Sequence, residues 1–348
     1  MNNSYTRRLI KHSFNGDHET QLSECGEANL HKYLMDCKKN PGHSKFIPVG
    51  SFTLEHLPEG HHDDSLYNFI KATADLTVKV MVQMTSPRRP EQYPFYSIRG
   101  NTNLRTGSGI LCGLQQYTDS EYRQLQQYTD SEYSQLQQYR DSEYSQNLGP
   151  HSVLSLKCPC KRCQHSDSPA CQWWKITVVT TAHVIFDDIE ASHTSLRLFY
   201  DMDDCPVVVV DTVKIIHTDI IADISWLICL TCDKSIGHKL SQTFVKFNTH
   251  IWKVRKKYLA TRDIDRLAFI VSHPHGCSKQ ISFGSWLDKR QVGKYHFQNK
   301  FTYTTCTCPG SSGAAVHCVG YDWCGYHLVL HSGSMRSGLN YSTSGFVY

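Results

Sequence analysis

Three short segments constrain the fold of this chain more than any other feature, because they place a histidine, an aspartate and a serine in a fixed order. Small residues surround Ser312 in the stretch 308–316, as they do where a backbone exposes a nucleophile beside free amide groups. Upstream, one apolar run ends at His183 and another begins at Asp223, and both runs predict strands. A serine hydroxyl needs a histidine to take its proton and an acid to orient that histidine. The sequence therefore predicts His183, Asp223 and Ser312 as the catalytic groups of acyl transfer.

At these positions the chain resembles the chymotrypsin-fold serine peptidases. The matching motifs are TAxH at His183, DIxxL at Asp223 and GxSG at Ser312, and the stretch 105–111 resembles the first strand of the glutamyl and HtrA-like branch. The resemblance covers roughly residues 98 to 348. It implies a mainly β fold, a double six-stranded antiparallel β-barrel with the cleft between the barrels, and a serine endopeptidase that acts through an acyl-enzyme.

The resemblance also assigns the acid and the oxyanion hole. Asp219 is close enough to compete with Asp223, but only Asp223 is followed by the apolar alternation of the family motif. If the loop folds as in the family, the backbone N–H groups of Gly310 and Ser312 bind the oxyanion. Ser311 stands where trypsin has the aspartate that pairs with a newly cleaved N-terminus. We therefore expect a site that is competent without N-terminal processing, unless the N-terminal region or an inserted repeat occludes it.

The expected primary pocket favours an acidic or amide side chain. Its candidate residues are Thr307, His331, Ser332 and Gly333, and a histidine with a hydroxyl at these places resembles the glutamyl endopeptidases and the viral 3C-type proteases. His331 can donate to a carboxylate or amide oxygen, while Cys306 offers no anion to attract lysine or arginine. The sequence thus predicts a preference for Glu or Gln at P1. The alternative is that His331 only packs within its strand.

Residues 1–97 lie outside the resemblance and are expected to form a small N-terminal α+β domain with a linker. The stretch 65–74 predicts a helix and the alternation over 76–82 predicts a strand. In the peptidase region we expect barrel one at about 98–235 and barrel two at about 245–348. The basic run 252–257 is expected to be the solvated edge of a strand.

An 11-residue repeat is inserted in the first barrel, at 114–146. Its period corresponds to about 3.67 residues per turn, which would align leucines and tyrosines on one stripe of a helix. Two interpretations remain open. The repeat is either an amphipathic insertion that pairs with a partner helix, or a dispensable surface loop whose added length costs little.

The 15 cysteines predict reduced thiols or metal ligands, because they are odd in number and the chain shows no export signal. We therefore expect an intracellular, cytoplasmic location. Catalysis requires no cofactor, but four cysteines are spaced so that they could hold a structural zinc ion. The alternative is a set of free thiols at a hairpin tip. The candidate ligands are Cys158, Cys160, Cys163 and Cys171.

Charge and hydropathy exclude some partners. The formal net charge is +4 and no block of lysine or arginine occurs, so we expect no nucleic-acid partner. No apolar run approaches about 18 residues, so we expect no membrane span. The expected partner is a protein or peptide substrate. A rival function on the same fold is a catalytically silent scaffold that binds extended peptides by β-augmentation.

Overall fold

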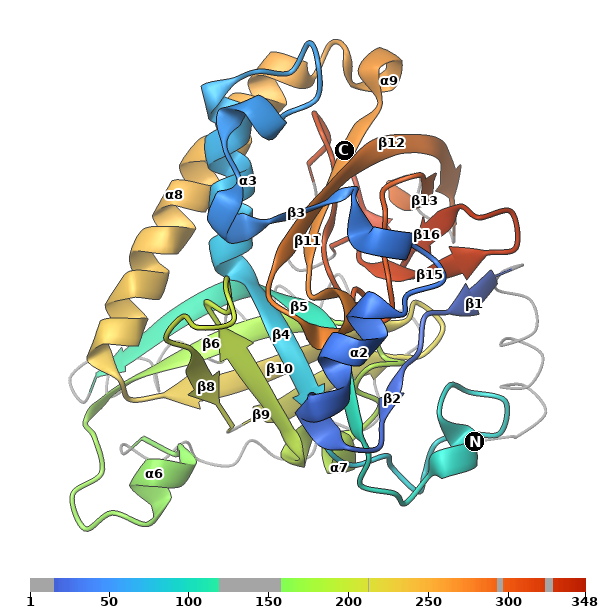
Figure 1. Ribbon diagram of the computed structural model, residues 1–348. Coiled ribbons are helices and arrows are strands. Elements are labelled where there is room, and N and C mark those ends of the chain that lie inside the picture. Colours follow the sequence, from blue (N-terminus) through green and yellow to red (C-terminus); the bar gives the residue numbers. More distant parts are fainter. Residues whose placement is uncertain (1–15, 119–157, 212, 293–296, 323–327) are drawn as a thin grey trace.

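Two antiparallel β-sheets form the body of the protein, and two long helices lie side by side along them (Figure 1). The computed structural model describes residues 16–118, 158–211, 213–292, 297–322 and 328–348. The helices are α2 (Leu30–Met35), α3 (Asp64–Leu76), α6 (Lys161–Gln164), α7 (Asp188–Ser192), α8 (Lys234–Tyr258) and α9 (Arg262–Asp265), with short 3-10 turns between several elements.

The first sheet has eight strands in the order β8-β7-β4-β5-β6-β10-β9, with β2 paired to β5. Six of them, β5 to β10, come from the region expected to form barrel one. The strands are β2 (Leu22–Ser23), β4 (Thr77–Val82), β5 (Leu104–Thr118), β6 (Gln172–Thr180), β7 (Thr194–Leu198), β8 (Val208–Val210), β9 (Val213–Asp219) and β10 (Ile224–Thr231).

The second sheet has nine strands in the order β1-β15-β16-β13-β12-β11-β14, with β17 paired to β13 and β3 to β12. The predicted mainly β fold with two antiparallel β units is therefore confirmed, but the two sheets have eight and nine strands rather than the six expected for each barrel. The strands are β1 (Gly16–His18), β3 (Phe46–Pro48), β11 (Leu267–Ser272), β12 (Gln280–Gln291), β13 (Gln298–Tyr303), β14 (Val316–Cys318), β15 (His331–Met335), β16 (Asn340–Ser342) and β17 (Gly345–Phe346).

The described part of the N-terminal region is built into both sheets, which differs from the expected separate domain. β4 lies between β5 and β7 and pairs with both, so the boundary expected at residue 97 separates two hydrogen-bonded neighbours of one sheet. β1 pairs with β15 and β3 pairs with β12 in the second sheet. The helix and the strand expected near 65–82 are present as α3 and β4. The sequence predicted that these segments form a helix and a strand, but it did not predict where they pack or which strands β4 pairs with.

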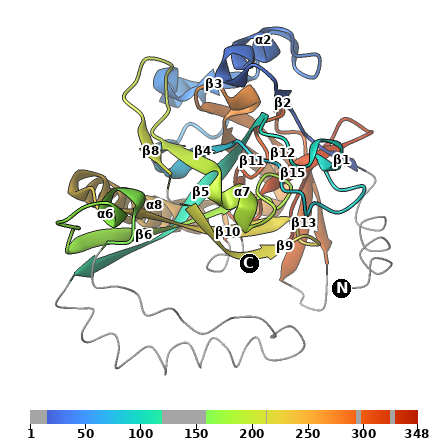
Figure 2. The same ribbon diagram turned by 90° about the horizontal axis from the view of Figure 1, so that it is seen from below.

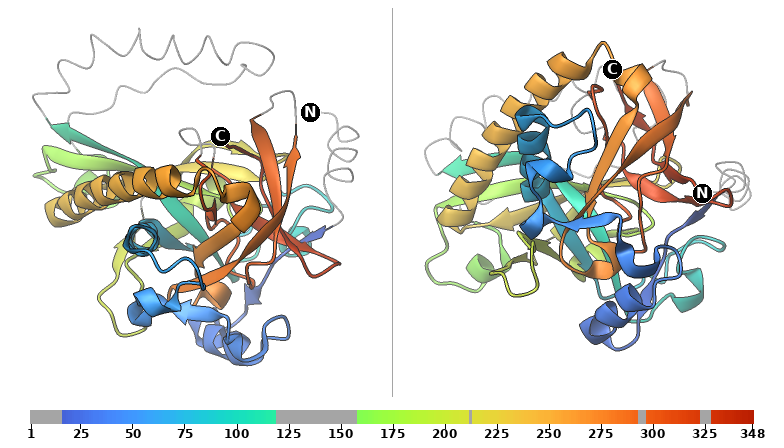
Figure 3. Two further views of the ribbon diagram at one scale, coloured as in Figure 1. Left: turned by 90° about the horizontal axis from the view of Figure 1, so that it is seen from above. Right: turned by 45° about the horizontal axis from the view of Figure 1, so that its top comes forward.

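α8 occupies the expected junction between the barrels, and the predicted strand edge at 252–257 is wrong because this run forms the last turns of the helix. The side chain of Asp233 caps its first turn by accepting from the N–H groups of Ser235 and Ile236. The basic residues in its last turn interact favourably with the negative, C-terminal end of the helix dipole. α8 packs against α3 (Figure 3). The ring centroids of Phe247 and Phe69 are 5.4 Å apart.

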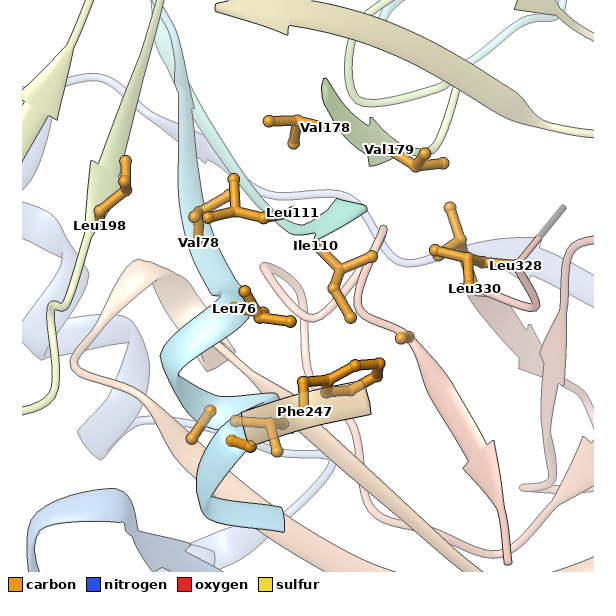
Figure 4. Packing of buried hydrophobic residues seen from close by; sticks show 14 of the residues in the cluster. Leu76, Val78, Ile110, Leu111, Val178, Val179, Leu198, Phe247, Leu328 and Leu330 are labelled. Carbon is orange, nitrogen blue, oxygen red and sulfur yellow. The ribbon is translucent and has the colours of Figure 1, made fainter. Parts of the chain in front are cut away.

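One apolar core joins the two sheets and the helices. Ile110 and Val178 of the first sheet, Leu330 beside the second sheet and Phe247 of α8 belong to the same cluster of buried side chains (Figure 4). A shared core holds the loops of both sheets in fixed relation, and the candidate site lies on such loops.

The repeat begins inside β5, which extends to Thr118, so the helical stripe expected from Leu114 and Tyr117 is wrong at these two residues. The remaining copies lie outside the described residues, which resume at 158. In the described part of the chain, no helix is both long and apolar enough to cross a membrane.

Candidate active site

His183 and Asp223 meet between neighbouring strands of the first sheet. His183 follows β6 and Asp223 directly precedes β10, which pairs with β6 along its length. Both side chains are buried, and His183 Nδ1 lies 2.8 Å from Asp223 Oδ2. The backbone N–H of His183 also donates to Asp223 Oδ1 at 3.0 Å. The aspartate therefore fixes the imidazole with Nδ1 protonated and leaves Nε2 free to accept a proton.

Ser332, expected in the pocket, instead supports the acid. Its hydroxyl donates to Asp223 Oδ2 at 2.6 Å. Burial raises the pKa of the Asp223 carboxyl, but His183, His18 and the Ser332 hydrogen bond hold this pKa well below its usual range. Asp223 is thus an anion at neutral pH. Asp219 accepts from the turn N–H groups of 221 and 222.

Ser312 lies on the loop before β14, and hydrogen bonds from the first sheet hold this loop in place. The N–H of Ser108 in β5 donates to Ser312 O at 2.8 Å, and the Ser108 hydroxyl donates to Gly310 O at 2.8 Å. Gly310 and Gly313 have φ angles of 96° and 88°, which favour glycine. These contacts place the nucleophile loop beside the His183 loop. Sequence reasoning missed Ser108, although it lies in the predicted first strand.

One hydrogen bond behind the loop orients the Gly310 N–H, one of the two predicted oxyanion donors. The carbonyl of Pro309 accepts from the N–H of His275 at 2.5 Å. Because C=O and N–H point in opposite directions across a trans peptide, the Gly310 N–H is turned away from His275. Neither this N–H nor that of Ser312 has a protein acceptor in the described ranges. Both donors are therefore available to a substrate oxygen.

The Ser312 hydroxyl forms no hydrogen bond with the predicted base in the described structure. His183 Nε2 is buried and has no hydrogen-bond partner among the described residues. Ser312 Oγ instead donates to the backbone carbonyl of Glu19 at 3.3 Å. In the described structure the predicted nucleophile therefore faces a peptide carbonyl of the chain's own N-terminal region, rather than the predicted base.

The predicted pocket residues Thr307 and His331 are buried, and so is Tyr303, which contacts His331. Burial holds the pKa of His331 well below its usual value, so its ring is neutral. Tyr303 Oη lies 2.7 Å from His331 Nδ1 and 3.2 Å from the carbonyl of Tyr341. The tautomer of His331 decides which of the two accepts the phenol proton: with the proton of the ring on Nε2, which faces the Glu19 carboxylate, Nδ1 accepts from the phenol.

The side chain of Glu19 lies among these predicted pocket residues. Its carboxylate lies 3.3 Å from His331 Nε2 and 3.2 Å from Thr307 Oγ1. Lys39 Nζ forms an ion pair with the same carboxylate and donates to Thr307 Oγ1 at 2.9 Å. Gly333, the remaining predicted pocket residue, lies on β15 and pairs with His18 of β1. Sequence reasoning missed Glu19 and Lys39 because it assigned residues 1–97 to a separate domain.

A buried ion cluster holds the loop that carries His183. Glu190 accepts from Arg89 Nε at 2.6 Å and from Arg89 Nη2 at 2.7 Å, and Arg105 Nη2 lies 3.0 Å away. Arg89 Nη2 also donates to the carbonyl of His183 at 3.0 Å, and Arg105 Nη1 donates to that of Val184 at 3.2 Å. The two arginines, paired with Glu190, thereby hydrogen-bond the backbone of His183 and of the residue that follows it.

The cysteine group differs from the prediction in its fourth member. Cys158, Cys160 and Cys163 gather as expected, but Cys232 after β10 joins them, while Cys171 is exposed and outside the group. Cys232 Sγ lies 3.6 Å from Cys163 Sγ and 3.8 Å from Cys160 Sγ. The correction follows from strand pairing, which sets the end of β10 beside the start of β6.

Comparisons with known proteins find similarity at the level of solved structures. An HtrA-type protease, AlgW, with a bound tripeptide is 11% identical, with a TM-score of 0.36 over 81% of this chain and 60% of that protein. The active form of the Rv3671c protease from M. tuberculosis is 10% identical, with a TM-score of 0.36 over 81% of this chain and 82% of that protein. This chain spans about three fifths of the HtrA-type structures.

No family model and no curated protein sequence matches the chain. The similar structures are proteases. Because identity and TM-score are low, we infer function from the geometry of the site itself.

Proposed function

We propose that the protein is a serine endopeptidase that cleaves after glutamate through His183, Asp223 and Ser312. The observation that carries the proposal is the Glu19 carboxylate, held by Thr307, His331 and Lys39. A pocket that surrounds one carboxylate with donors, beside a base and a nucleophile, is the arrangement that acyl transfer at a glutamyl bond requires.

Each group of the triad has a defined role in this reaction. Ser312 Oγ attacks the carbonyl carbon while His183 Nε2 takes the hydroxyl proton and then delivers it to the leaving amine. Asp223 stabilises the imidazolium that forms. The N–H groups of Gly310 and Ser312 bind the oxyanion, and water releases the acyl group by the reverse sequence. The proposed partners are accordingly protein or peptide substrates, and catalysis needs no cofactor.

Charge selects glutamate over glutamine in this pocket. His331 Nε2–H and the Thr307 hydroxyl can serve an amide oxygen as well as a carboxylate. The ammonium of Lys39 favours only the anion, and a charge-assisted hydrogen bond contributes more than a neutral one. The finer proposal is therefore a preference for Glu over Gln at P1.

Lys39→Met should lower the ratio of kcat/KM for a P1-Glu peptide to that for its P1-Gln counterpart by about tenfold, the worth of one charge-assisted hydrogen bond. The adjacent Lys38 is exposed, and Lys38→Met is the matched control. The measurement is hydrolysis of two peptides that differ only at P1. An unchanged ratio in Lys39→Met would remove Lys39 from the pocket, and equal rates for peptides with Ala and Glu at P1 in the unaltered protein would contradict the glutamyl preference.

We further propose that the thiolates of Cys158, Cys160, Cys163 and Cys232 bind one structural zinc ion. All four sulfur atoms lie within 4.8 Å of one another, and four thiolates in a tetrahedron are a common structural zinc site. Cys232→Ser should remove one equivalent of zinc from the purified protein, while Cys171→Ser should retain it. Zinc content measured by mass spectrometry decides between them, and the same content in both variants would contradict this ligand set.

The state of the cysteines supports an intracellular location as part of the proposal. Several buried cysteines of the described residues, among them Cys229, Cys277 and Cys318, form no disulfide. Reduced thiols persist where the glutathione and thioredoxin systems operate.

A further inference from the structure

The chain's own residues 16–19 lie in the cleft in the manner of a bound substrate. β1 pairs antiparallel with β15, with Asp17 opposite Ser334 and His18 opposite Gly333 (Figures 1 and 2). The ring of His18 stacks on His183 with centroids 4.3 Å apart. The strand that supplies the pocket histidine therefore also binds the residues that precede Glu19.

The backbone of both strands fits this close approach. A Cβ on Gly333 would collide with the carbonyl of Asp17, and a Cβ on Gly16 would collide with the ring of Tyr341. Main-chain pairing with alternate side chains in pockets is how a protease-like cleft holds an extended peptide.

Both sides of the Glu19–Thr20 bond are anchored. On one side the Glu19 side chain fills the pocket and its carbonyl oxygen lies 3.3 Å from Ser312 Oγ. On the other side Gln21 Oε1 lies 2.6 Å from His275 Nδ1, and Leu22 of β2 pairs with Arg105 of β5. Anchoring on both sides holds the Glu19–Thr20 bond beside Ser312 Oγ, and such proximity favours reaction within one molecule. For attack, the Glu19 carbonyl oxygen has to move from Ser312 Oγ to the N–H groups of Gly310 and Ser312, which have no protein acceptor in the described ranges.

We propose that the protein cleaves its own Glu19–Thr20 bond in cis, an inference that rests on the proposed glutamyl endopeptidase activity. Ser312 Oγ forms an ester with the carbonyl carbon of Glu19, and the bond to the nitrogen of Thr20 breaks. His183 transfers the serine proton to that nitrogen. Water then hydrolyses the ester, regenerates Ser312 and leaves residues 1–19 as a free acid.

Cleavage also opens the site. Before it, residues 16–19 cover β15 and fill the pocket that an external glutamyl peptide needs. After it, these residues are held only by non-covalent contacts and can be exchanged for substrate. The N-terminal segment is thus both the first substrate and the cover of the site. The sequence predicts a site that is competent without processing unless the N-terminal region occludes it, and this segment is the part of that region that does so.

The test is the mass and the N-terminal sequence of purified full-length protein followed over time. The unaltered chain should lose residues 1–19 and begin at Thr20, while Ser312→Ala should stay intact. Glu19→Ala should slow the loss at least tenfold, and Glu24→Ala, an exposed glutamate nearby, should not. A first-order rate that is independent of protein concentration supports cleavage in cis, and a rate that rises with concentration would overturn it.

A second variant separates this inference from the proposed function. Glu19→Lys places a cation against Lys39, so the segment should leave the pocket, self-cleavage should stop, and an external P1-Glu peptide should still be hydrolysed. External hydrolysis together with an intact Glu19–Thr20 bond in the unaltered chain would overturn self-cleavage alone. Absence of both reactions in Glu19→Lys and in the unaltered chain would overturn the proposed function as well.

A separate observation points to a second metal site, behind the nucleophile loop. Cys37, His43, His275 and Cys308 bring their ligand atoms within 4.8 Å of one another. Cys308 Sγ lies 3.6 Å from Cys37 Sγ and 3.4 Å from His43 Nε2. Ligand atoms around a tetrahedral zinc ion are about 3.3–3.8 Å apart, as bond lengths of 2.0–2.3 Å require.

The surrounding hydrogen bonds fit a metal rather than a packed cluster. His275 Nδ1 contacts Gln21, while its Nε2 is buried without a hydrogen-bond partner among the described residues. Asn40 Nδ2 donates to Cys308 Sγ at 3.1 Å, and Asn40 N donates to Cys37 Sγ at 3.4 Å. A histidine oriented through its other nitrogen and sulfurs that accept N–H bonds are what a bound metal needs around its ligands.

We infer that these four residues bind a second zinc ion, which joins the segment that carries Lys39 to the loop that carries Ser312. His43→Ala should remove one zinc equivalent, while Cys232→Ser removes a different one, so the double variant should lose both. Metal content of the full-length protein is the measurement. A content that is unchanged in His43→Ala would overturn the inference. So would a Cys37–Cys308 disulfide in the protein purified without reductant, seen as a mass lower by two hydrogens.

Discussion

Ser312→Ala should lower hydrolysis of a P1-Glu peptide by a factor on the order of a million, because the hydroxyl supplies the only nucleophile that the proposed mechanism uses. The background rate that survives should come from the oxyanion donors and from substrate binding. A fluorophosphonate probe should label Ser312 in the unaltered protein and should fail to label the variant. Hydrolysis is measured as kcat/KM on the folded, full-length chain.

Ser311→Ala is the matched control, since it makes the same change one residue away in the same loop. The Ser311 hydroxyl accepts from the N–H of Cys308 at 3.2 Å and from the Ser272 hydroxyl at 3.0 Å. Losing two neutral hydrogen bonds costs about 1–3 kcal/mol, so the control should lose at most about a hundredfold in activity, far less than the loss expected for Ser312→Ala. Equal losses in the two variants would mean that the loop rather than the Ser312 hydroxyl is needed. Folded protein that neither cleaves nor accepts the probe would favour the scaffold function.

The triad could be predicted from the sequence because each member lies at the end or the start of a strand with a local apolar pattern. His183 follows β6, Asp223 precedes β10, and Ser312 lies in a glycine-rich loop. The pairing of β6 with β10 then brings the first two together without further information. Local signals suffice where one strand pair decides the geometry.

The N-terminal region could not be placed in this way, because a strand pattern gives no partner. The stretch 77–82 is buried along its whole length, so its alternation does not show which face of the strand points toward the core. Its pairing with β5 and β7 depends on residues more than 20 positions away. For the same reason the sequence could not predict that segment 16–19 and Lys39 lie at the candidate site.

The sequence did not predict the helix α8 or the fourth cysteine of the group, for two different reasons. The buried residues of α8, such as Leu240, Thr243 and Phe247, follow a spacing of three and four that is typical of a helix. The exposed apolar side chains of Val245 and Trp252 obscure that stripe. Cys232 is 69 positions from Cys163, and only the pairing of β10 with β6 makes them neighbours.

Glu190→Ala should lower the free energy of unfolding by about 3–5 kcal/mol, the cost of leaving buried charges without their partner. Arg89 and Arg105 would both remain fully buried, and their cationic groups would face each other across the vacated site. Urea unfolding followed by tryptophan fluorescence is the measurement. Glu24→Ala, at an exposed position, should change stability by less than about 0.5 kcal/mol. Similar effects for the two variants would contradict a structural role for the cluster.

The pH dependence of this difference follows from the charge of Glu190. Burial raises the pKa of its carboxyl, but the hydrogen bonds from Arg89 and the charges of both arginines lower that pKa below its ordinary value of 4.5. A lowered pKa in the folded state means that the stabilisation is complete above the unfolded value and is lost as the pH falls. The difference between the unaltered protein and Glu190→Gln should therefore be constant near neutral pH and should shrink below about pH 4.5. Because Arg89 also binds the carbonyl of His183, the same acid range should loosen the loop that carries the catalytic base.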